Sequence, residues 1–132
     1  MQYEPTLDRD GLVDLAINKY FGNVDKKNMD GVLDCFHDGA LMCVQTDFVR
    51  HDGKAEVRRM FEDFFQTWDT ILHHQFVTTV DEKNGRVSAA FEAVLTDADG
   101  GRTVFNNTNF WRVRDGKFQE VYIYFSGPNV LV

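Results

Sequence analysis

The sequence has 132 residues, a length that suits one domain, and its 43% hydrophobic and 27% charged residues are ordinary for a soluble globular protein. A formal net charge of −7 argues against binding to nucleic-acid phosphates, because that binding needs lysine and arginine to displace counterions. No apolar run approaches about 18 residues and no charged-then-apolar leader is present, so we expect a cytoplasmic protein that does not cross a membrane.

Three segments of the first half have the 3.6-residue period of amphipathic helices. Residues 8–21 carry a broad apolar face, and a shorter helix with apolar residues up to position 36 follows Asn28, a residue type that caps helix N-termini. Gly39 is placed to end this second helix in the left-handed conformation. Residues 54–71 give the strongest period, with large side chains three and four residues apart.

Strand signals dominate the rest of the chain. Residues 40–44 predict a short buried strand, and a loop is expected through Asp47 and residues 52–53. Residues 73–80, 86–96, 102–114 and 117–125 are β-rich, and Asn-Gly, Asp-Gly or Gly-Gly in the turns between them predict three consecutive hairpins. Several of these strands exceed the usual length of about 5–6 residues, so the sheet should twist and curl around the helices.

The fold class that follows is α+β. We expect a single domain over residues 1–132, in which three N-terminal helices pack on a long, curved antiparallel sheet that encloses a pocket. The two cysteines, Cys35 and Cys43, form no CxxC pair, and we expect both to be reduced and buried. No recognised ligand spacing predicts a metal site, and we expect no cofactor.

The order of elements and three strings of residues resemble the nuclear transport factor 2-like superfamily, which has a cystatin-like fold. The closest likeness is to its SnoaL-like polyketide cyclase and ketosteroid isomerase-like branch. The strings are residues 28–40 (NMDGVLDCFHDGA), residues 53–57 (GKAEV) and residues 109–117 (NFWRVRDGK). The resemblance covers nearly the whole chain, and it implies a cone-shaped fold with a small-molecule pocket and pairing through the outer face of the sheet.

The resemblance also assigns candidate roles to single positions. In ketosteroid isomerase a tyrosine and a carboxylic acid donate hydrogen bonds to the developing oxyanion, and Tyr20 and Asn109 fall at these positions. An amide can still donate through its NH₂ group, so this pair stays chemically sensible. The family's general base falls on Val44, which cannot move a proton, so isomerisation by that route is not expected.

Histidines are the next candidates for proton transfer. His73 and His74 lie near the position of a histidine in scytalone dehydratase, another member of the superfamily, and neighbouring strand residues point to opposite faces. We take His74, with Tyr20, as the candidate catalytic group; the alternative is a partly exposed histidine at a strand edge. His51 and Asp47 lie in a loop at the expected pocket mouth, where a histidine is usually exposed to solvent.

Two hypotheses for the function follow. In the first, the pocket binds a small, mostly apolar molecule such as a cyclic compound, and isomerase- or lyase-like chemistry on it is expected by family analogy. The alternative is a non-catalytic dimeric binding or accessory module, which a cavity below roughly 100 Å³ would favour, since ligand pockets usually have about 300–1,000 Å³. Both hypotheses include a homodimer through the outer sheet face that carries Phe110, Tyr122 and Tyr124.

The expected ligand-binding residues combine apolar walls with few polar groups. Asn107 and Asn109 stand out among them, because two amides on one aromatic strand face are costly to bury unless they have partners. They either form buried hydrogen bonds with helix backbone or orient a ligand. The full set is Tyr20, Val44, Phe61, Phe64, Trp68, His74, Phe91, Asn107, Asn109, Trp111, Val121, Ile123 and Phe125.

Overall fold

The structure is a computed structural model that describes residues 4–132. Its first helical stretch is continuous and consists of α1 (Arg9–Val13), the π-helical η1 (Asp14–Phe21) and α2 (Gly22–Asp25). The other helices are α3 (Met29–Leu33) and α4 (Lys54–Thr67). The strands are β1 (Phe36–Val44), β2 (Val49–Asp52), β3 (Thr70–Asp81), β4 (Arg86–Thr96), β5 (Arg102–Arg114) and β6 (Lys117–Tyr124). No helix in this described part is long and apolar enough to span a membrane.

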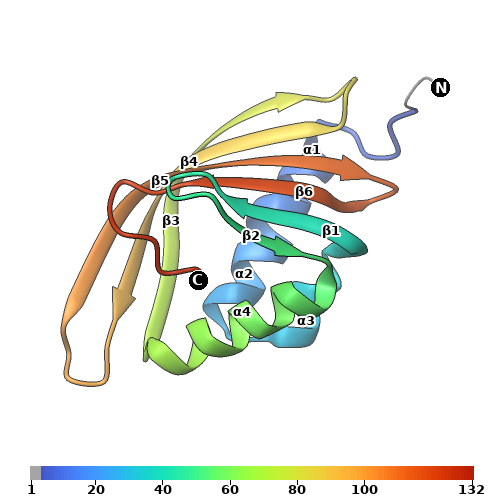
Figure 1. Cartoon of the computed structure of the whole chain (residues 1–132). Helices are drawn as coiled ribbons and strands as arrows, with labels where there is room; N and C mark the ends of the chain where they lie inside the picture. The colour runs from blue at the N-terminus through green and yellow to red at the C-terminus, as the bar shows by residue number, and fades with distance from the viewer. Residues whose placement is uncertain (1–3) are drawn as a thin grey trace.

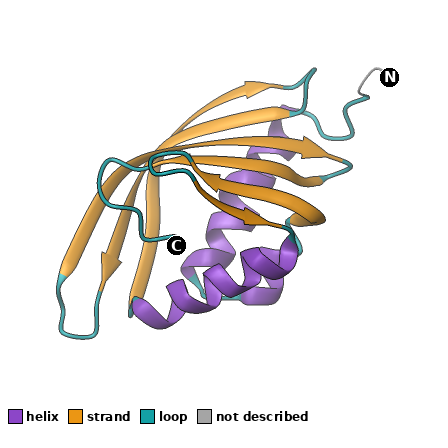
Figure 2. Ribbon diagram, viewed as in Figure 1, coloured by secondary structure: helices purple, strands orange, loops and turns teal. Residues whose placement is uncertain are grey.

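The six strands form one curved sheet in the order β2-β1-β6-β5-β4-β3 (Figure 1). The helices lie together on its concave side (Figure 2). The predicted α+β class and the helix-covered curved sheet are thus confirmed. The expectation of a purely antiparallel sheet is corrected, because β1 runs parallel to β6. β6, the last strand of the β3–β6 meander, pairs with β1. The sheet is open, because its two edge strands, β2 and β3, do not pair with each other.

The three predicted hairpins are present and place the side chains as the alternation of the sequence indicated. Asp115 and Gly116, between β5 and β6, both have a positive φ (52° and 76°), which a two-residue hairpin turn demands. The register of β4 and β5 sets Asn107 opposite Phe91 and Asn109 opposite Ala89 on the concave face. Both asparagines are therefore carried into the interior by the same strand.

The prediction that Gly39 ends the second helix is wrong. Helix α3 ends at Leu33 and is followed by Asp34, while Gly39 lies inside β1. Residues before the expected strand are drawn into the sheet because β1 pairs with β6 from Phe36 onwards, with a register shift before Leu41. The cap expected at the other end of the helix is correct, since the Asn28 side chain accepts a hydrogen bond from the Gly31 amide.

Two boundaries around α4 also differ from the sequence pattern. The segment expected as a loop contains β2, a short strand that pairs with β1 as Val49 with Val44 and Asp52 with Leu41. The long helix ends at Thr67 rather than near residue 71, because Trp68 has an extended backbone (φ −108°, ψ 129°) and Ile71 already belongs to β3. Apolar spacing continued across this junction because both elements bury side chains in the same core.

An aromatic cluster fills the space between η1 and the sheet. Tyr20 is 2% exposed, and its ring centroid lies between 4.9 and 6.3 Å from those of five other rings. Four of these contacts are edge-to-face or close to it, a favoured geometry for aromatic pairs. The rings in contact with it are those of Phe21, Phe36, Phe61, Trp111 and Phe118.

Both cysteines are free and buried, as predicted. Burial raises the pKa of the Cys35 thiol to about 11, so only roughly one part in a thousand is thiolate at pH 8. We expect iodoacetamide at pH 8 to leave Cys35 unmodified in the folded protein and to alkylate it in guanidinium chloride, as read by mass spectrometry of the peptides. Alkylation of Cys35 at equal rates in both conditions would contradict its burial.

Candidate functional site

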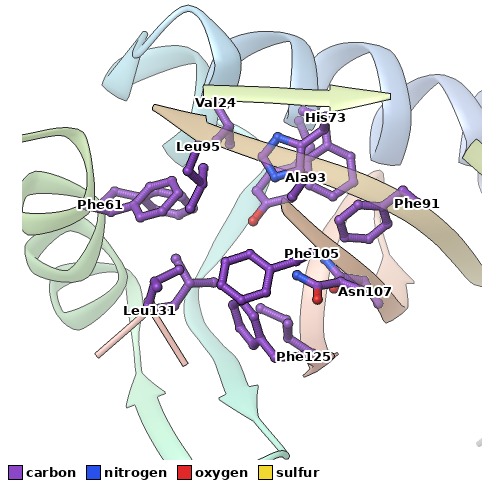
Figure 3. Close-up of a pocket in the computed structure, with 16 residues that line it drawn as sticks. Val24, Phe61, His73, Phe91, Ala93, Leu95, Phe105, Asn107, Phe125 and Leu131 are labelled. Carbon is purple, nitrogen blue, oxygen red and sulfur yellow. The ribbon is translucent and has the colours of Figure 1, made fainter. Parts of the chain in front are cut away.

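A cavity lies between the helices and the concave face of the sheet, and residues of the C-terminal segment complete its wall (Figure 3). The centre of a water-sized sphere can move through about 30 Å³, within about 420 Å³ of unfilled space that partly opens to solvent. One water molecule needs about 10–15 Å³ on the first of these measures. The cavity therefore has room for about two waters and not for a ring compound, and its volume is below the roughly 100 Å³ under which the non-catalytic module is favoured.

The structure brings eight of the thirteen expected ligand-binding residues to this cavity and leaves five outside it. The eight that line it are Tyr20, Phe61, Phe64, Phe91, Asn107, Asn109, Ile123 and Phe125. Val44, Trp111 and Val121 are instead fully buried in the surrounding core, and Trp68 follows the end of α4. His74 is the fifth residue outside the cavity. The lining residues that the sequence reasoning missed are Phe21, Val24, Ala93, Leu95, Phe105, Val130 and Leu131, together with the alternative histidine, His73.

His73, not His74, lines the cavity, and a β-bulge is the reason. The pairing of β3 with β4 shifts by one residue between His74 and Val77, where Gln75 takes a positive φ of 57°. With uninterrupted alternation His74 would share the face of Phe76, which packs against the core. The extra residue reverses this relation. The expectation that His74 faces the pocket is therefore corrected: its Nε2 lies 2.8 Å from Oε1 of Glu92, and its side chain is 37% exposed.

His73 is held by Asp25, the last residue of α2. The main-chain N–H of His73 donates to Oδ2 of Asp25 at 2.9 Å, and its Nδ1 lies 2.6 Å from Oδ1. An ionised carboxylate only accepts hydrogen bonds, so Nδ1 carries the proton and donates it. The ring also stacks on Phe21 with centroids 4.3 Å apart. Nε2 makes no hydrogen bond within residues 4–132 and is the nitrogen left for a molecule in the cavity.

The two asparagines differ in how their amides are satisfied. Oδ1 of Asn107 accepts a hydrogen bond from the Ser126 amide at 3.1 Å. Oδ1 of Asn109, in a residue that is 2% exposed, is buried and has no partner among the described residues. A buried acceptor without a donor is costly, and a hydroxyl or N–H of a ligand would relieve that cost. Both asparagines line the cavity, but Oδ1 of Asn107 is paired within the protein, whereas Oδ1 of Asn109 has no partner among the described residues.

Tyr20 reaches the same cavity from η1. Burial, and secondarily the nearby Cys35 thiol, raise the pKa of its hydroxyl above the ordinary value. The phenol therefore stays protonated near neutral pH and can donate a hydrogen bond. Tyr20, His73 and the two asparagines thus bring a hydroxyl, an imidazole and two amides to an otherwise apolar cavity wall. This is the pattern of few, placed polar groups in an apolar wall that small-molecule sites show.

His51 is placed differently from the sequence expectation. It lies on β2 rather than in a loop and is 2% exposed, so the expected solvent exposure is wrong. Its Nε2 lies 2.8 Å from the Leu131 carbonyl oxygen, at the edge of the cavity. Asp47 accepts hydrogen bonds from the Asn129 side chain of the same C-terminal segment. In the described part of the chain, no three His, Cys, Asp or Glu side chains gather as a metal site would require.

Comparison with known proteins places this geometry in a family. The SnoaL-like domain matches residues 17–121. No curated protein sequence matches the chain. One similar solved structure is a provisionally named polyketide cyclase from Xanthomonas campestris pv. campestris, with 19% sequence identity, a TM-score of 0.79, and coverage of 89% of this chain and 92% of that one. A second is the epoxide hydrolase/cyclase-like enzyme SalBIII of salinomycin pyran ring formation, with 16% identity, a TM-score of 0.79, and coverage of 90% and 93%. A third is a provisionally named isomerase from Bacillus subtilis, with 15% identity, a TM-score of 0.79, and coverage of 92% and 89%. At these identities the likenesses show the fold.

The unpaired acceptor of Asn109 predicts a stability gain on its removal. We expect Asn109→Leu, of similar volume, to raise the free energy of unfolding by about 1–3 kcal/mol, because it removes a buried group without a donor. Asn107→Leu is the matched control on the same strand face, and it should gain less because it breaks the bond to Ser126. Guanidinium unfolding of both variants measures this, and equal gains would contradict the difference between the two amides.

Proposed function

The chain belongs to the SnoaL-like family, and we propose that its cavity binds a small, mostly apolar molecule with a hydroxyl or carbonyl group and moves a proton on it. The observation that carries this proposal is the Asp25–His73 pair at the cavity wall. An imidazole whose Nδ1 proton is fixed by a carboxylate presents Nε2 as an oriented general base or acid. Asp25 is a positioning residue, and His73 takes the catalytic role that the sequence analysis gave to His74.

The remaining polar groups suit the binding of an oxygen function. Tyr20 donates to a carbonyl or oxyanion, and Asn109 accepts from a hydroxyl. In Figure 3 His73 and Asn107 lie on opposite sides of the space that Phe105 and Leu131 border. Proton abstraction beside a carbonyl, with the oxyanion held by Tyr20, is a step shared by isomerisation, dehydration and ring closure. The similar proteins named as a cyclase and an isomerase support this class of chemistry by analogy of fold.

The size of the cavity sets a condition on the proposal. A volume of about 30 Å³ does not admit a ring, so binding requires part of the wall to move. The helices and the β4–β5 ladder are packed and hydrogen-bonded along their length, whereas the C-terminal residues Val130 and Leu131 belong to no helix or strand. A wall that cannot move would leave the non-catalytic module as the better description.

Proton exchange on simple ketones tests the catalytic proposal without knowledge of the natural substrate. We expect the protein in D₂O to accelerate α-proton exchange of small cyclic ketones such as cyclohexanone, as followed by NMR. His73→Gln should lower the rate of exchange by roughly 10²-fold or more, because general acid–base catalysis contributes about 10²–10⁴-fold. Asp25→Asn should lower the rate less, since the imidazole that acts as the base is still present but is no longer oriented by a carboxylate.

His74→Gln is the matched control, because the neighbouring histidine is paired with Glu92 outside the cavity. It should exchange α-protons as fast as the unchanged protein. Equal losses in His73→Gln and His74→Gln would assign the effect to a general loss of structure. No acceleration by the unchanged protein with any of the cyclic ketones would overturn the catalytic proposal and favour the accessory module.

A homodimer through the convex face of the sheet is proposed under either function. Phe110 and Tyr124 are each 47% exposed on neighbouring strands, with ring centroids 5.9 Å apart. Leu72 and Val104 are also exposed, at 47% and 44%. The Phe110–Tyr124 pair is the aromatic part of this face, and exposed apolar groups that lie together on a sheet are typical of an interface, whereas single ones need no explanation.

Charge reversal tests this dimer. We expect Phe110→Glu to shift the protein from dimer to monomer in sedimentation velocity, because a buried unpaired carboxylate is strongly disfavoured. Phe48→Glu is the matched control, since Phe48 is 80% exposed in the turn between β1 and β2, away from the sheet face. A dimer that survives Phe110→Glu, or that Phe48→Glu breaks equally, would place the interface elsewhere.

A further inference from the structure

Residues 126–132, which we call the strap, follow β6 and supply part of the cavity wall. After β6 the chain turns back beneath the sheet, and its C-terminal end lies on the side of α4 and β2 (Figure 1). Val130 and Leu131 line the cavity from this segment. Leu131 is 9% exposed and is the deepest residue of the strap, while its neighbour Val132 is 59% exposed. The strap therefore contributes two apolar side chains to the cavity wall, although most of its residues lie at or near the surface.

The strap is held by side chains rather than by a main-chain ladder. Within the described residues, no hydrogen bond between main-chain groups joins residues 126–132 to another segment. Its beginning is tied at Ser126, whose amide donates to Asn107 Oδ1 and whose Oγ accepts from the Asn106 amide. Farther along, the Asn129 side chain donates to Asp47 and accepts from the Leu131 amide. Segments with few main-chain hydrogen bonds open at low free-energy cost.

The end of the strap is held by a chain of hydrogen bonds that runs through the buried His51. A guanidinium only donates, so NH2 of Arg59 donates to Nδ1 of His51 at 3.3 Å. This fixes the other tautomer, in which Nε2–H donates to the Leu131 carbonyl at 2.8 Å. Arg59 also donates to Asp63 and to the main-chain oxygen of Val132. His51 of β2 and Arg59 of α4 thus hydrogen-bond the main-chain oxygens of Leu131 and Val132, at the end of the strap that lines the cavity.

We propose that the strap is the movable wall of the ligand site, that His51 is its latch, and that Leu131 sets the largest molecule the closed site accepts. This rests on the proposed function for its biological meaning, since it identifies the residues that select the ligand by size. It explains how a cavity of about 30 Å³ belongs to a site with an oriented proton-transfer group. The rest of the wall comes almost entirely from helices and paired strands, so the strap is the part that moves.

Hydrogen exchange tests the latch. We expect His51→Phe to raise the exchange rate of the Leu131 amide about fivefold to tenfold, the effect of losing one buried hydrogen bond, with β4 and β5 unchanged. His37→Phe is the matched control, because His37 also bonds a main-chain carbonyl, that of Arg114, but away from the strap. Equal exchange of Leu131 in the two variants overturns the latch. Should His51→Phe not fold, Arg59→Met removes the donor to His51 Nδ1 and to the Val132 oxygen while the acceptor of the Leu131 amide stays in place, and it gives the same comparison.

Benzene binding tests the role of Leu131. The unchanged protein should take up benzene slowly or not at all, as seen by NMR shifts of the cavity residues. Leu131→Ala should bind it with at least about tenfold higher affinity, as enlarged apolar cavities do. His51→Phe should mainly speed its association. If benzene enters the unchanged protein and Leu131→Ala equally well, the strap does not limit the site.

These measurements fail separately from the proposed catalysis. Benzene has no exchangeable proton and needs no catalytic group, so a movable strap without ketone exchange would support the strap and overturn the catalytic proposal. Ketone exchange in a protein whose strap amides stay equally protected in His51→Phe and His37→Phe would do the reverse.

Discussion

The contact between Asp25 and His73 fixes the geometry on which the cavity depends. One carboxylate accepts two hydrogen bonds from one residue, from its main-chain N–H and from Nδ1, and so ties the end of the first helical stretch to β3. Both the position of the strand and the orientation of the ring are set by it. The stack of the ring on Phe21 adds a second restraint from the same helical stretch. A ring held in this way keeps one nitrogen directed away from the helix.

The β-bulge at Gln75 is the second feature that places His73 at the cavity. A positive φ at a residue other than glycine is a strained conformation that surrounding contacts must hold in place. Here the strain lets His73 and Phe76 both reach the interior, and both pack with Phe91. Without the extra residue, one of the two would face solvent. The bulge therefore combines an apolar contact with a polar group on one short stretch of strand.

The two asparagines of the cavity wall differ in whether their amide oxygen has a hydrogen-bond donor, and this difference indicates different roles. Asn107 sits among aromatic residues but has its acceptor paired with Ser126, so its burial is compensated locally. Asn109 lies beside Ala89 and Ile123 in the ladder, where small and apolar side chains offer it no donor. Leucine would fit such a place better on stability alone. A residue that costs stability at a cavity wall is typical of a binding position, where local rules of folding are broken for function.

The sequence predicted what local pattern controls and missed what tertiary contacts decide. Helical periods, the Asn28 cap and the Asp115–Gly116 turn are local signals, and the structure contains each of them. The histidine choice failed because a bulge inserts one residue without any glycine or proline to mark it. β2 was missed because an edge strand of four residues has no clear alternation. Burial of His51 depends on Leu131, which is 80 residues away in the sequence.

Asn107 connects the ligand site with the strap. It lines the cavity, and its Oδ1 holds the amide of Ser126, the first residue of the strap. A ligand in the cavity would therefore contact the same side chain that holds the first residue of the strap. Any coupling through this residue is reciprocal: a ligand that favours the closed strap is itself bound more tightly when the strap is closed, and by the same factor. A small cavity closed by a weakly held segment is then a way to bind selectively: an apolar molecule gains burial only when the strap can close over it, and Leu131 decides which molecules allow that.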